Sequence, residues 1–340
     1  MKAAVIPEVN GRWELREVPA PRPGPGEVLV RVRACGVCSN DVMATRGIIP
    51  FPAVSPAITG HEVAGEIAEV GDGVTAHAVG DRVGVPWVQA GCGRCDYCRR
   101  GLPVTGQTAM SCPAAVSTGF TVQGGHAEYM VAKAEGTFPL PDGLSYESAA
   151  PVLCAGYTSW SALRQADPKP HERVAVVGIG ALGHLALQFA RSCGFETIAV
   201  TRSPGKHDLA RELGADLVVG SGKELLEVGG ADVILATASS SAAASESLLG
   251  LRPDGRLVLC GLDGTDSFNL APDPMRPIFS QRHQITGATH NGPRYLREAL
   301  ELVAAGKVTP LVETFPMERV ADAVDRVAKG DVRFRAVVTY

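Results

Sequence analysis

A buried strand, a glycine-rich turn and a helix follow one another near the middle of this 340-residue chain. Residues 173–177 (RVAVV) are a continuous apolar run, as expected of a strand that is buried on both faces. The turn reads Gly178-x-Gly180-x-x-Gly183, and a helical pattern follows to Cys193. The first glycine permits the tight turn, the second lets the backbone approach a pyrophosphate, and the third lets helix and strand pack closely. The pattern predicts a dinucleotide site with the phosphates at the helix start.

Strand and helix signals keep alternating after this turn. The predicted segments are 197–201, 207–213, 216–219, 232–236 and 256–260. This alternation predicts an α/β fold of the Rossmann type, a doubly wound parallel sheet. Residues 1 to about 145 instead carry short strand patterns separated by turn residues, so this part is predicted to be β-rich. A helical stretch is expected from Tyr146 through Cys154 to Leu163, and the end of the chain (335–340) is predicted to be a strand.

The length of the chain exceeds what one hydrophobic core usually serves, which favours two domains. We expect a β-rich catalytic domain formed by residues 1–150 and 290–340, with a dinucleotide-binding domain of residues 151–289 inserted between its parts.

Composition excludes several classes of protein. The net charge is −4 with no block of like charges, which argues against nucleic acid or an anionic membrane as a partner. No stretch approaches the roughly 18 apolar residues that cross a bilayer. The nine cysteines are odd in number and three of them have metal-ligand spacing, which favours a reducing environment over a disulfide framework. We therefore expect a cytoplasmic protein.

The end of the second strand of the nucleotide domain indicates which dinucleotide binds. An NAD site normally has an acidic residue there, about 20 residues beyond the first glycine. This chain instead reads Thr201-Arg202-Ser203, with Lys206 close behind. Arg202 can grip a 2′-phosphate with two parallel hydrogen bonds, and Lys206 adds a second positive charge. We therefore predict NADP(H), the alternative being that Arg202 is an ordinary solvated residue.

Two groups of residues have the side chains that bind zinc. Cys92, Cys95 and Cys98 repeat every third residue, the spacing of a closed thiolate site. Cys38 and His61 offer a thiolate and an imidazole, the mixed donors of a catalytic site. Taken singly, a free cysteine is more often a buried core residue and a histidine more often a structural one.

The chain resembles the zinc-containing alcohol dehydrogenases of the medium-chain dehydrogenase/reductase superfamily. Residues 60–74 match that family's zinc signature, GHE-x-x-G-x5-G-x-x-V, at every fixed position. Residues 35–41 are similar to its first ligand segment and residues 154–158 to its third, while 178–187 and 334–338 also resemble family segments. The similarity covers essentially the whole chain in the right order, and it implies a GroES-like catalytic domain beside the Rossmann domain.

The resemblance implies Cys38, His61 and Cys154 as ligands of a catalytic zinc. Glu62 would be either an alternate ligand or an electrostatic neighbour, and Asp41 a partner that orients the site. It also places Thr158 near the nicotinamide and Arg335 near the cofactor phosphates. The expected cofactor contacts are therefore Thr158, Gly178, Gly180, Leu182, Gly183, Thr201, Arg202, Lys206 and Arg335.

The resemblance also implies a second, structural zinc. Its first three ligands are Cys92, Cys95 and Cys98, and relatives place a fourth cysteine with seven residues in between. Here thirteen residues separate Cys98 from Cys112, and 101–109 reads as an insertion. We take Cys112 as the fourth ligand, the alternatives being another ligand or an unfilled site.

One departure from the family pattern leaves the chemistry open. Most relatives have Ser or Thr two residues after the first zinc cysteine, and several have a His three residues further on; here these positions are Asn40 and Met43. Asn can form hydrogen bonds to an oxygen but cannot titrate. The favoured hypothesis is hydride transfer between NADP(H) and an alcohol/carbonyl pair. The alternatives are reduction of a conjugated C=C or C=N bond and a zinc-bound NADPH-binding protein with little turnover. A small-molecule substrate and a homo-oligomer are expected.

Overall fold

The computed structural model describes residues 1–100, 111–261 and 267–340, and the chain divides into two compact units. The first unit comprises residues 1–154, 292–304 and 310–340, and the second comprises 155–291 and 305–309. Residues 305–309, which were predicted to belong to the catalytic domain, fall in the second unit. None of the described helices is long and apolar enough to cross a membrane.

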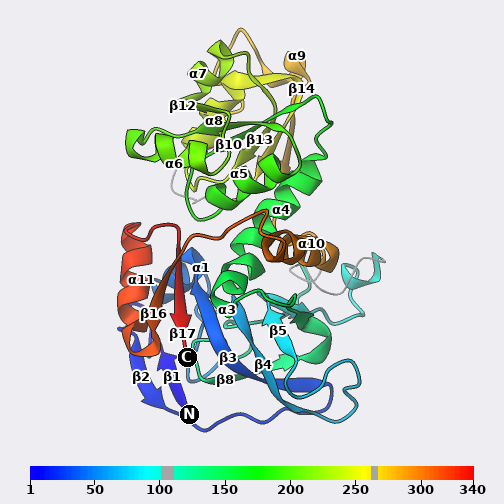
Figure 1. The fold of residues 1–340 in the computed structure, drawn as a ribbon, viewed down its shortest axis with the longest axis vertical. Coiled ribbons are helices and arrows are strands. Elements are labelled where there is room, and N and C mark those ends of the chain that lie inside the picture. Colours follow the sequence, from blue (N-terminus) through cyan, green and yellow to red (C-terminus); the bar gives the residue numbers. More distant parts are fainter. Residues whose placement is uncertain (101–110, 262–266) are drawn as a thin grey trace. The chain divides into compact units, whose positions relative to one another are not determined.

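The second unit is built on a six-stranded parallel sheet (Figure 1). In spatial order its strands are β12 (Leu217–Val219), β11 (Glu196–Val200), β10 (Arg173–Val177), β13 (Ala231–Ala236), β14 (Leu251–Leu259) and β15 (Gln284–Gly287). The order of strands reverses between β10 and β13, the switch point at which such sheets bind ligands. The doubly wound fold predicted from the sequence is confirmed.

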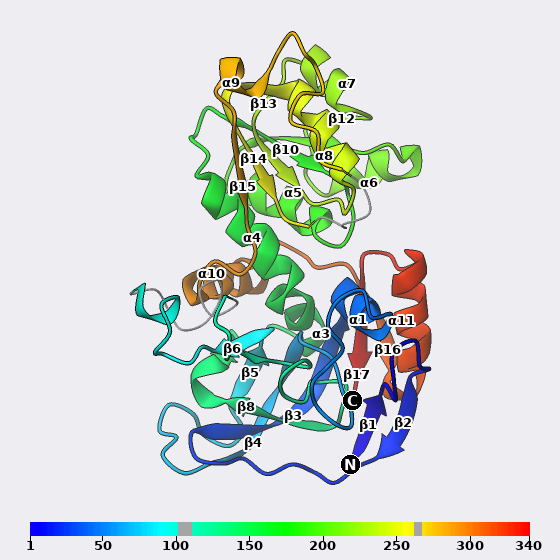
Figure 2. The same ribbon diagram turned by 180° about the vertical axis from the view of Figure 1, so that it is seen from behind.

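Helices connect and cover these strands (Figure 2). They are α4 (Ala155–Ala166), α5 (Gly183–Ser192), α6 (His207–Glu212), α7 (Gly222–Glu227), α8 (Ser241–Ser247) and α9 (Ile278–Gln281). Helices α4 and α5 pack on one another, and α5 packs on β10 and β11. The centre of the sheet is buried, since all five residues of β10 are buried.

The first unit contains a seven-stranded sheet. Its strands run in the order β16 (Val312–Pro316), β17 (Arg335–Thr339), β3 (Glu27–Val37), β4 (Val63–Val70), β5 (Arg82–Val85) and β9 (Phe138–Pro139), and β8 (Tyr129–Lys133) also pairs with β3. Two small sheets pair β1 (Lys2–Val5) with β2 (Glu14–Glu17) and β6 (Val88–Ala90) with β7 (Val116–Ser117). The helices of this unit are α1 (Ser39–Thr45), α3 (Tyr146–Ala149), α10 (Pro293–Ala304) and α11 (Val320–Lys329).

The helix predicted from Tyr146 to Leu163 is wrong as one continuous element. After α3 the chain tightens into a 3₁₀ turn, Ala150–Leu153, and Cys154 has the non-helical angles φ −131° and ψ −70°. Pro151 in this turn has no N–H group to continue the α-helical ladder. Helix α4 begins only at Ala155, so Cys154 lies at the break between the elements.

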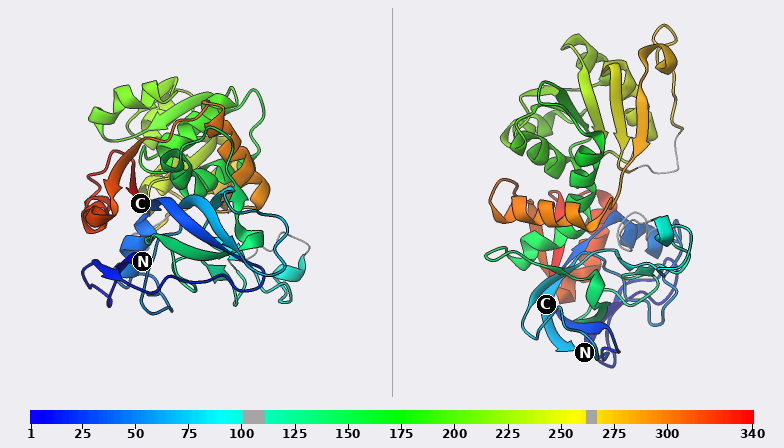
Figure 3. Two further views of the ribbon diagram at one scale, coloured as in Figure 1. Left: turned by 60° about the horizontal axis from the view of Figure 1, so that its bottom comes forward. Right: turned by 90° about the vertical axis from the view of Figure 1, so that its right-hand side faces the viewer.

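The two ends of the chain lie close together in the first unit (Figure 3). Strand β17 pairs antiparallel with β3 and parallel with β16. Strand β16 was not predicted. Its sequence, VETFP, does not alternate between apolar and polar residues, and only Phe315 is buried in it.

Candidate active site and metal centres

The register of three neighbouring strands gathers the predicted catalytic residues at one end of the sheet. Strand β17 pairs with β3 so that Ala336 faces Val37, and β4 pairs with β3 so that Val63 faces Cys35. Arg335 and Cys38 are the next residues beyond the first pair, and Glu62 is the next residue beyond Val63 in the second. The three residues therefore lie at the same end of the sheet. The backbone N–H of Gly36 donates to the carbonyl of Glu62 at 3.0 Å, which continues the β3–β4 ladder to this point.

Four donor side chains meet there: Cys38, His61, Glu62 and Cys154. One ligand atom from each lies within 4.8 Å of the others. His61 and Glu62 are completely buried, and Cys154 is nearly so. Cys154 reaches this position from the break between α3 and α4, far from the other three in sequence.

The chemistry of these donors fits a divalent cation. Both ring nitrogens of His61 are buried, and neither has a hydrogen-bond partner among the residues that the structure describes. A hydrogen bond from the Cys154 thiol lowers the pKa of Cys38 well below its usual range. Burial acts to lower the pKa of His61, but the negative charges of Asp41 and Cys38 outweigh it and raise that pKa to about 9. A zinc ion would replace these protons, since zinc binds deprotonated thiol and imidazole.

Asp41 holds the two ligand segments together. Its carboxylate accepts hydrogen bonds from the backbone N–H of Cys38 at 2.9 Å and of Gly60 at 3.1 Å. The nearest ring nitrogen of His61 is 3.8 Å from the same carboxylate, and both side chains are fully buried. The role expected of Asp41, to orient the site, therefore has a geometric basis. Asn40 is next to it on α1 and is half-buried.

Glu62 forms a buried ion pair with Arg335. The Arg335 Nη2 group donates to both carboxylate oxygens, at 2.5 Å for Oε2, and the two side chains are 4% and 0% exposed. Burial raises the pKa of Glu62 to about 7 although Arg335 acts against this shift. The family resemblance implied a place for Arg335 near the cofactor phosphates, and its pairing with Glu62 was not predicted. The sequence did contain one indication of a charged partner, because Arg335 is a cation at the start of a strand whose other residues, AVVT, are uncharged.

Aromatic side chains stand on one side of His61. The ring of Trp87 is 5.0 Å from the imidazole, and Phe120 stacks on Trp87 at 5.1 Å. Both aromatic residues are half-buried. Trp160, in contrast, is a core residue of the second unit packed on Phe189.

The second cluster contains Cys92, Cys95, Cys98 and Cys112, whose sulfur atoms lie within 4.8 Å of one another. Backbone N–H groups donate to its sulfurs, from Cys92 to Cys112 at 3.3 Å and from Cys95 to Cys92 at 3.4 Å. Such hydrogen bonds, first from Arg94 and then from Cys95, lower the pKa of Cys92 to about 6. These hydrogen bonds favour the thiolate form of Cys92, whereas burial raises the pKa of Cys98 to about 11. A four-sulfur zinc site would hold all four cysteines as thiolates. The insertion at 101–109 lies outside the described residues.

Replacing Cys112 by Ser is expected to empty this cluster and lower the melting temperature by on the order of 10 °C, because structural zinc contributes its binding free energy to folding. Metal analysis and differential scanning calorimetry measure both effects. The exposed Cys193, replaced by Ser, is the matched control. Unchanged zinc content and melting temperature in Cys112→Ser would show that another group completes the site.

The glycine loop leaves space where a phosphate is expected. Gly178 has φ +87°, and a Cβ on Gly183 would lie 2.0 Å from the Gly178 carbonyl oxygen, so both positions require glycine. A Cβ on Gly180 would meet no atom within 4 Å. Leu182 is the N-cap residue of α5, and its carbonyl accepts a hydrogen bond from Ser159 at 3.0 Å. The space beside Gly180 thus leaves the loop backbone accessible to a phosphate.

The residues beyond β11 add positive charge near this loop. Arg202 is exposed and has no hydrogen-bond or ion-pair partner within the described part of the chain. The Lys206 ammonium donates to the carbonyl oxygen of Ile179 in the loop at 2.9 Å. The Thr201 hydroxyl accepts a hydrogen bond from the Ser203 N–H at 3.4 Å, and Thr158 is buried in α4. His184 contacts the Gly180 carbonyl oxygen through Nδ1 at 3.1 Å.

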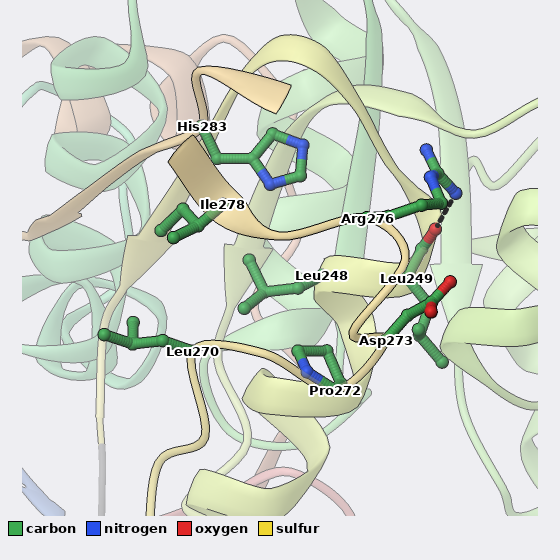
Figure 4. Close-up of a pocket in the computed structure, with 8 residues that line it drawn as sticks. All are labelled: Leu248, Leu249, Leu270, Pro272, Asp273, Arg276, Ile278 and His283. Atoms are coloured by element: carbon green, nitrogen blue, oxygen red, sulfur yellow. Dashed lines mark hydrogen bonds between the residues drawn. The ribbon is translucent and has the colours of Figure 1, made fainter. Parts of the chain in front are cut away.

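Two further pockets lie away from these groups. One in the second unit has a volume of about 10 Å³, which suits a single water molecule. Figure 4 shows its lining, in which Arg276 donates to the carbonyl of Leu249. The other, of about 150 Å³, lies in the first unit between Gln89, Gln123 and Lys133. Among the residues that the structure describes, neither pocket is lined by one of the two groups of metal-ligating side chains.

Comparison with known proteins agrees with this geometry. Residues 24–142 match the alcohol dehydrogenase GroES-like domain, and residues 181–305 match the zinc-binding dehydrogenase family. An alcohol dehydrogenase from Geobacillus stearothermophilus is 41% identical over 344 residues, which cover 99% of each chain. The chain therefore belongs to the zinc-containing alcohol dehydrogenases of the medium-chain dehydrogenase/reductase superfamily, and the resemblance found in the sequence is confirmed.

Solved structures agree along the whole chain. A zinc-binding dehydrogenase from Sinorhizobium meliloti 1021, bound to NADP, superposes with a TM-score of 0.88 at 26% identity and covers 100% of this chain and 99% of its own. Acetophenone reductase from Geotrichum candidum, in complex with NAD, gives a TM-score of 0.84 at 25% identity, with coverage of 100% and 97%. Similar structures thus bind either dinucleotide.

Proposed function

We propose that this alcohol dehydrogenase is zinc-dependent and prefers NADP(H), transferring a hydride between the nicotinamide and an alcohol/carbonyl pair. The observation that carries the proposal is the donor set Cys38, His61 and Cys154, in which His61 and Cys154 are buried and, within the described part of the chain, both His61 ring nitrogens are unpartnered. Together with Glu62 as a neighbour or alternate ligand, these residues would hold the catalytic zinc. When bound, zinc supplies a Lewis acid that polarises a carbonyl oxygen.

The side chains around the donors support this chemistry by orientation and by exclusion of water. Asp41 fixes the backbone of both ligand segments, so that the donors keep their positions through the reaction. Arg335 neutralises Glu62 and keeps the net charge of the donor set low enough for a substrate oxygen to approach. Trp87 and Phe120 form an apolar wall beside His61.

NADP(H) preference rests on the free guanidinium of Arg202 and on the absence of an acidic residue at the end of β11. A 2′-phosphate can form two charge-assisted hydrogen bonds with such a guanidinium. Lys206 is close to the same loop and adds attraction for the phosphates.

The direct test is to measure initial rates of NADPH and NADH oxidation with a panel of aliphatic and aromatic aldehydes. Aldehyde turnover with a clear NADPH preference is the expected result. The same panel should include enones and imines, because Asn40 cannot titrate and leaves the proton path to Ser39 or to water. Consumption of NADPH with enones or imines alone would replace the carbonyl reaction by C=C or C=N reduction.

Replacing Arg202 by Ala is expected to lower kcat/KM for NADPH about tenfold or more and to leave that for NADH nearly unchanged, because charge-assisted hydrogen bonds contribute roughly 1.5–3 kcal/mol each. Steady-state kinetics with each cofactor measures the ratio. Arg211→Ala, at an exposed arginine that pairs with Asp208 on α6, is the matched control. An equal loss for both cofactors would contradict a role for Arg202 in 2′-phosphate recognition.

A further inference from the structure

Tyr340 contacts His126, a residue that packs against the segment carrying His61. The backbone N–H of Tyr340 donates to the Arg33 carbonyl at 3.2 Å and so extends the pairing of β17 with β3. Its half-buried ring packs on two core clusters of the first unit. The phenol oxygen is 3.2 Å from Nδ1 of His126, a side chain that is completely buried.

His126 lies directly against Gly60, the residue before the ligand His61. Gly60 has φ +95°, and a Cβ there would lie 2.8 Å from Cδ2 of the His126 ring. The backbone of the same segment holds Gly60 in place, since the N–H of Gly125 donates to the Gly60 carbonyl at 2.8 Å and the N–H of His126 to the Thr59 carbonyl at 3.0 Å. A rotation of the His126 imidazole would therefore push on the backbone that carries His61.

The imidazole also contacts the other ligand segment through Trp13. The Trp13 ring meets it edge-on at 5.3 Å. The indole N–H donates to the Thr45 hydroxyl at 3.2 Å, and that hydroxyl donates to the Asp41 carbonyl at 2.8 Å. Asp41 in turn binds the backbone of Cys38 and of Gly60. His126 thus stands between the two segments whose spacing sets the distance from Cys38 to His61.

We infer that Tyr340 is a positioning residue for the catalytic metal site, acting through His126. Among the described residues the Tyr340 hydroxyl is the only hydrogen-bond partner of the His126 side chain, whose Nε2 atom is buried without one. The hydroxyl therefore fixes the orientation of the ring against Gly60. The inference rests on the proposed zinc site but not on the identity of the substrate.

The test is Tyr340→Phe, which removes one oxygen atom and keeps the ring. Zinc release from the purified protein to a chromogenic chelator is followed over time, with the four-cysteine cluster as an internal reference. We expect release from the catalytic site to be about three- to tenfold faster than in the wild type, because partners behind the ligands tune metal affinity. Release from the four-cysteine cluster should be unchanged. Cobalt(II) in the catalytic site should show shifted d–d bands.

Tyr146→Phe is the matched control. The Tyr146 hydroxyl is also engaged, donating to Glu66 at 2.7 Å and accepting from Arg82 at 3.1 Å, in the same unit. This variant should be less stable without a faster release of catalytic zinc. Wild-type release and cobalt spectra in Tyr340→Phe, or an equal acceleration at both zinc sites in both variants, would overturn the inference. A changed release rate in an enzyme that reduces no carbonyl would uphold the inference and reject the proposed reaction.

Discussion

Replacing His61 by Ala is expected to lower kcat/KM for carbonyl reduction by at least about 10³-fold and to reduce zinc content from two ions to one per chain. Among the described residues His61 supplies the nitrogen donor of this set, and without it only the Cys38 and Cys154 thiols and the Glu62 carboxylate would be left to hold zinc. Loss of the metal removes the charge that stabilises the developing alkoxide, a contribution of several kcal/mol.

The expected loss is specific to this site. His171 is exposed and lies outside both donor clusters, so His171→Ala should retain full activity and both zinc ions. The zinc that remains in His61→Ala should resist chelators as the four-cysteine site does. Full zinc content together with a loss of less than tenfold would mean that His61 is not a ligand.

Replacing Arg335 by Leu is expected to destabilise the first unit by about 3–5 kcal/mol, because it leaves the Glu62 carboxylate buried without a partner. At roughly 2–4 °C per kcal/mol this lowers the melting temperature by on the order of 10 °C. Calorimetry on the zinc-loaded protein measures the shift.

The double variant Glu62→Gln/Arg335→Leu separates charge from packing. Removing both charges should restore much of the stability that Arg335→Leu loses, since no unpaired charge remains. A double variant as unstable as Arg335→Leu would mean that Arg335 stabilises the unit through its packing and not through Glu62.

The parts of the fold that sequence reasoning reached are those with local signals. Strand β10, with four apolar residues before a glycine turn, has the predicted limits, and the strand predicted at 335–340 is found as β17 over Arg335–Thr339. Short-range patterns suffice there because burial and backbone geometry act on neighbouring residues. The interruption at Cys154 was missed because the apolar run continues through it, and Pro151 was the one local sign of a break.

The arrangement of the site depended on contacts that no local pattern contains. Glu62 and Arg335 are 273 residues apart, and His126 and Tyr340 are 214 residues apart. These pairs exist because β17 lies beside β3, so strand order and register decide them. Resemblance to a family grouped Cys38, His61 and Cys154 before the structure did, but it gave no reason for Arg335 to contact Glu62.

The most direct test of zinc-dependent catalysis is an anomalous diffraction measurement at the zinc edge on crystals of the purified, active protein. Two peaks per chain are expected, one among Cys38, His61 and Cys154 and one among the four cysteines that include Cys92 and Cys112. A single peak at the four-cysteine cluster, in protein that reduces aldehydes at full rate, would contradict a catalytic role for zinc.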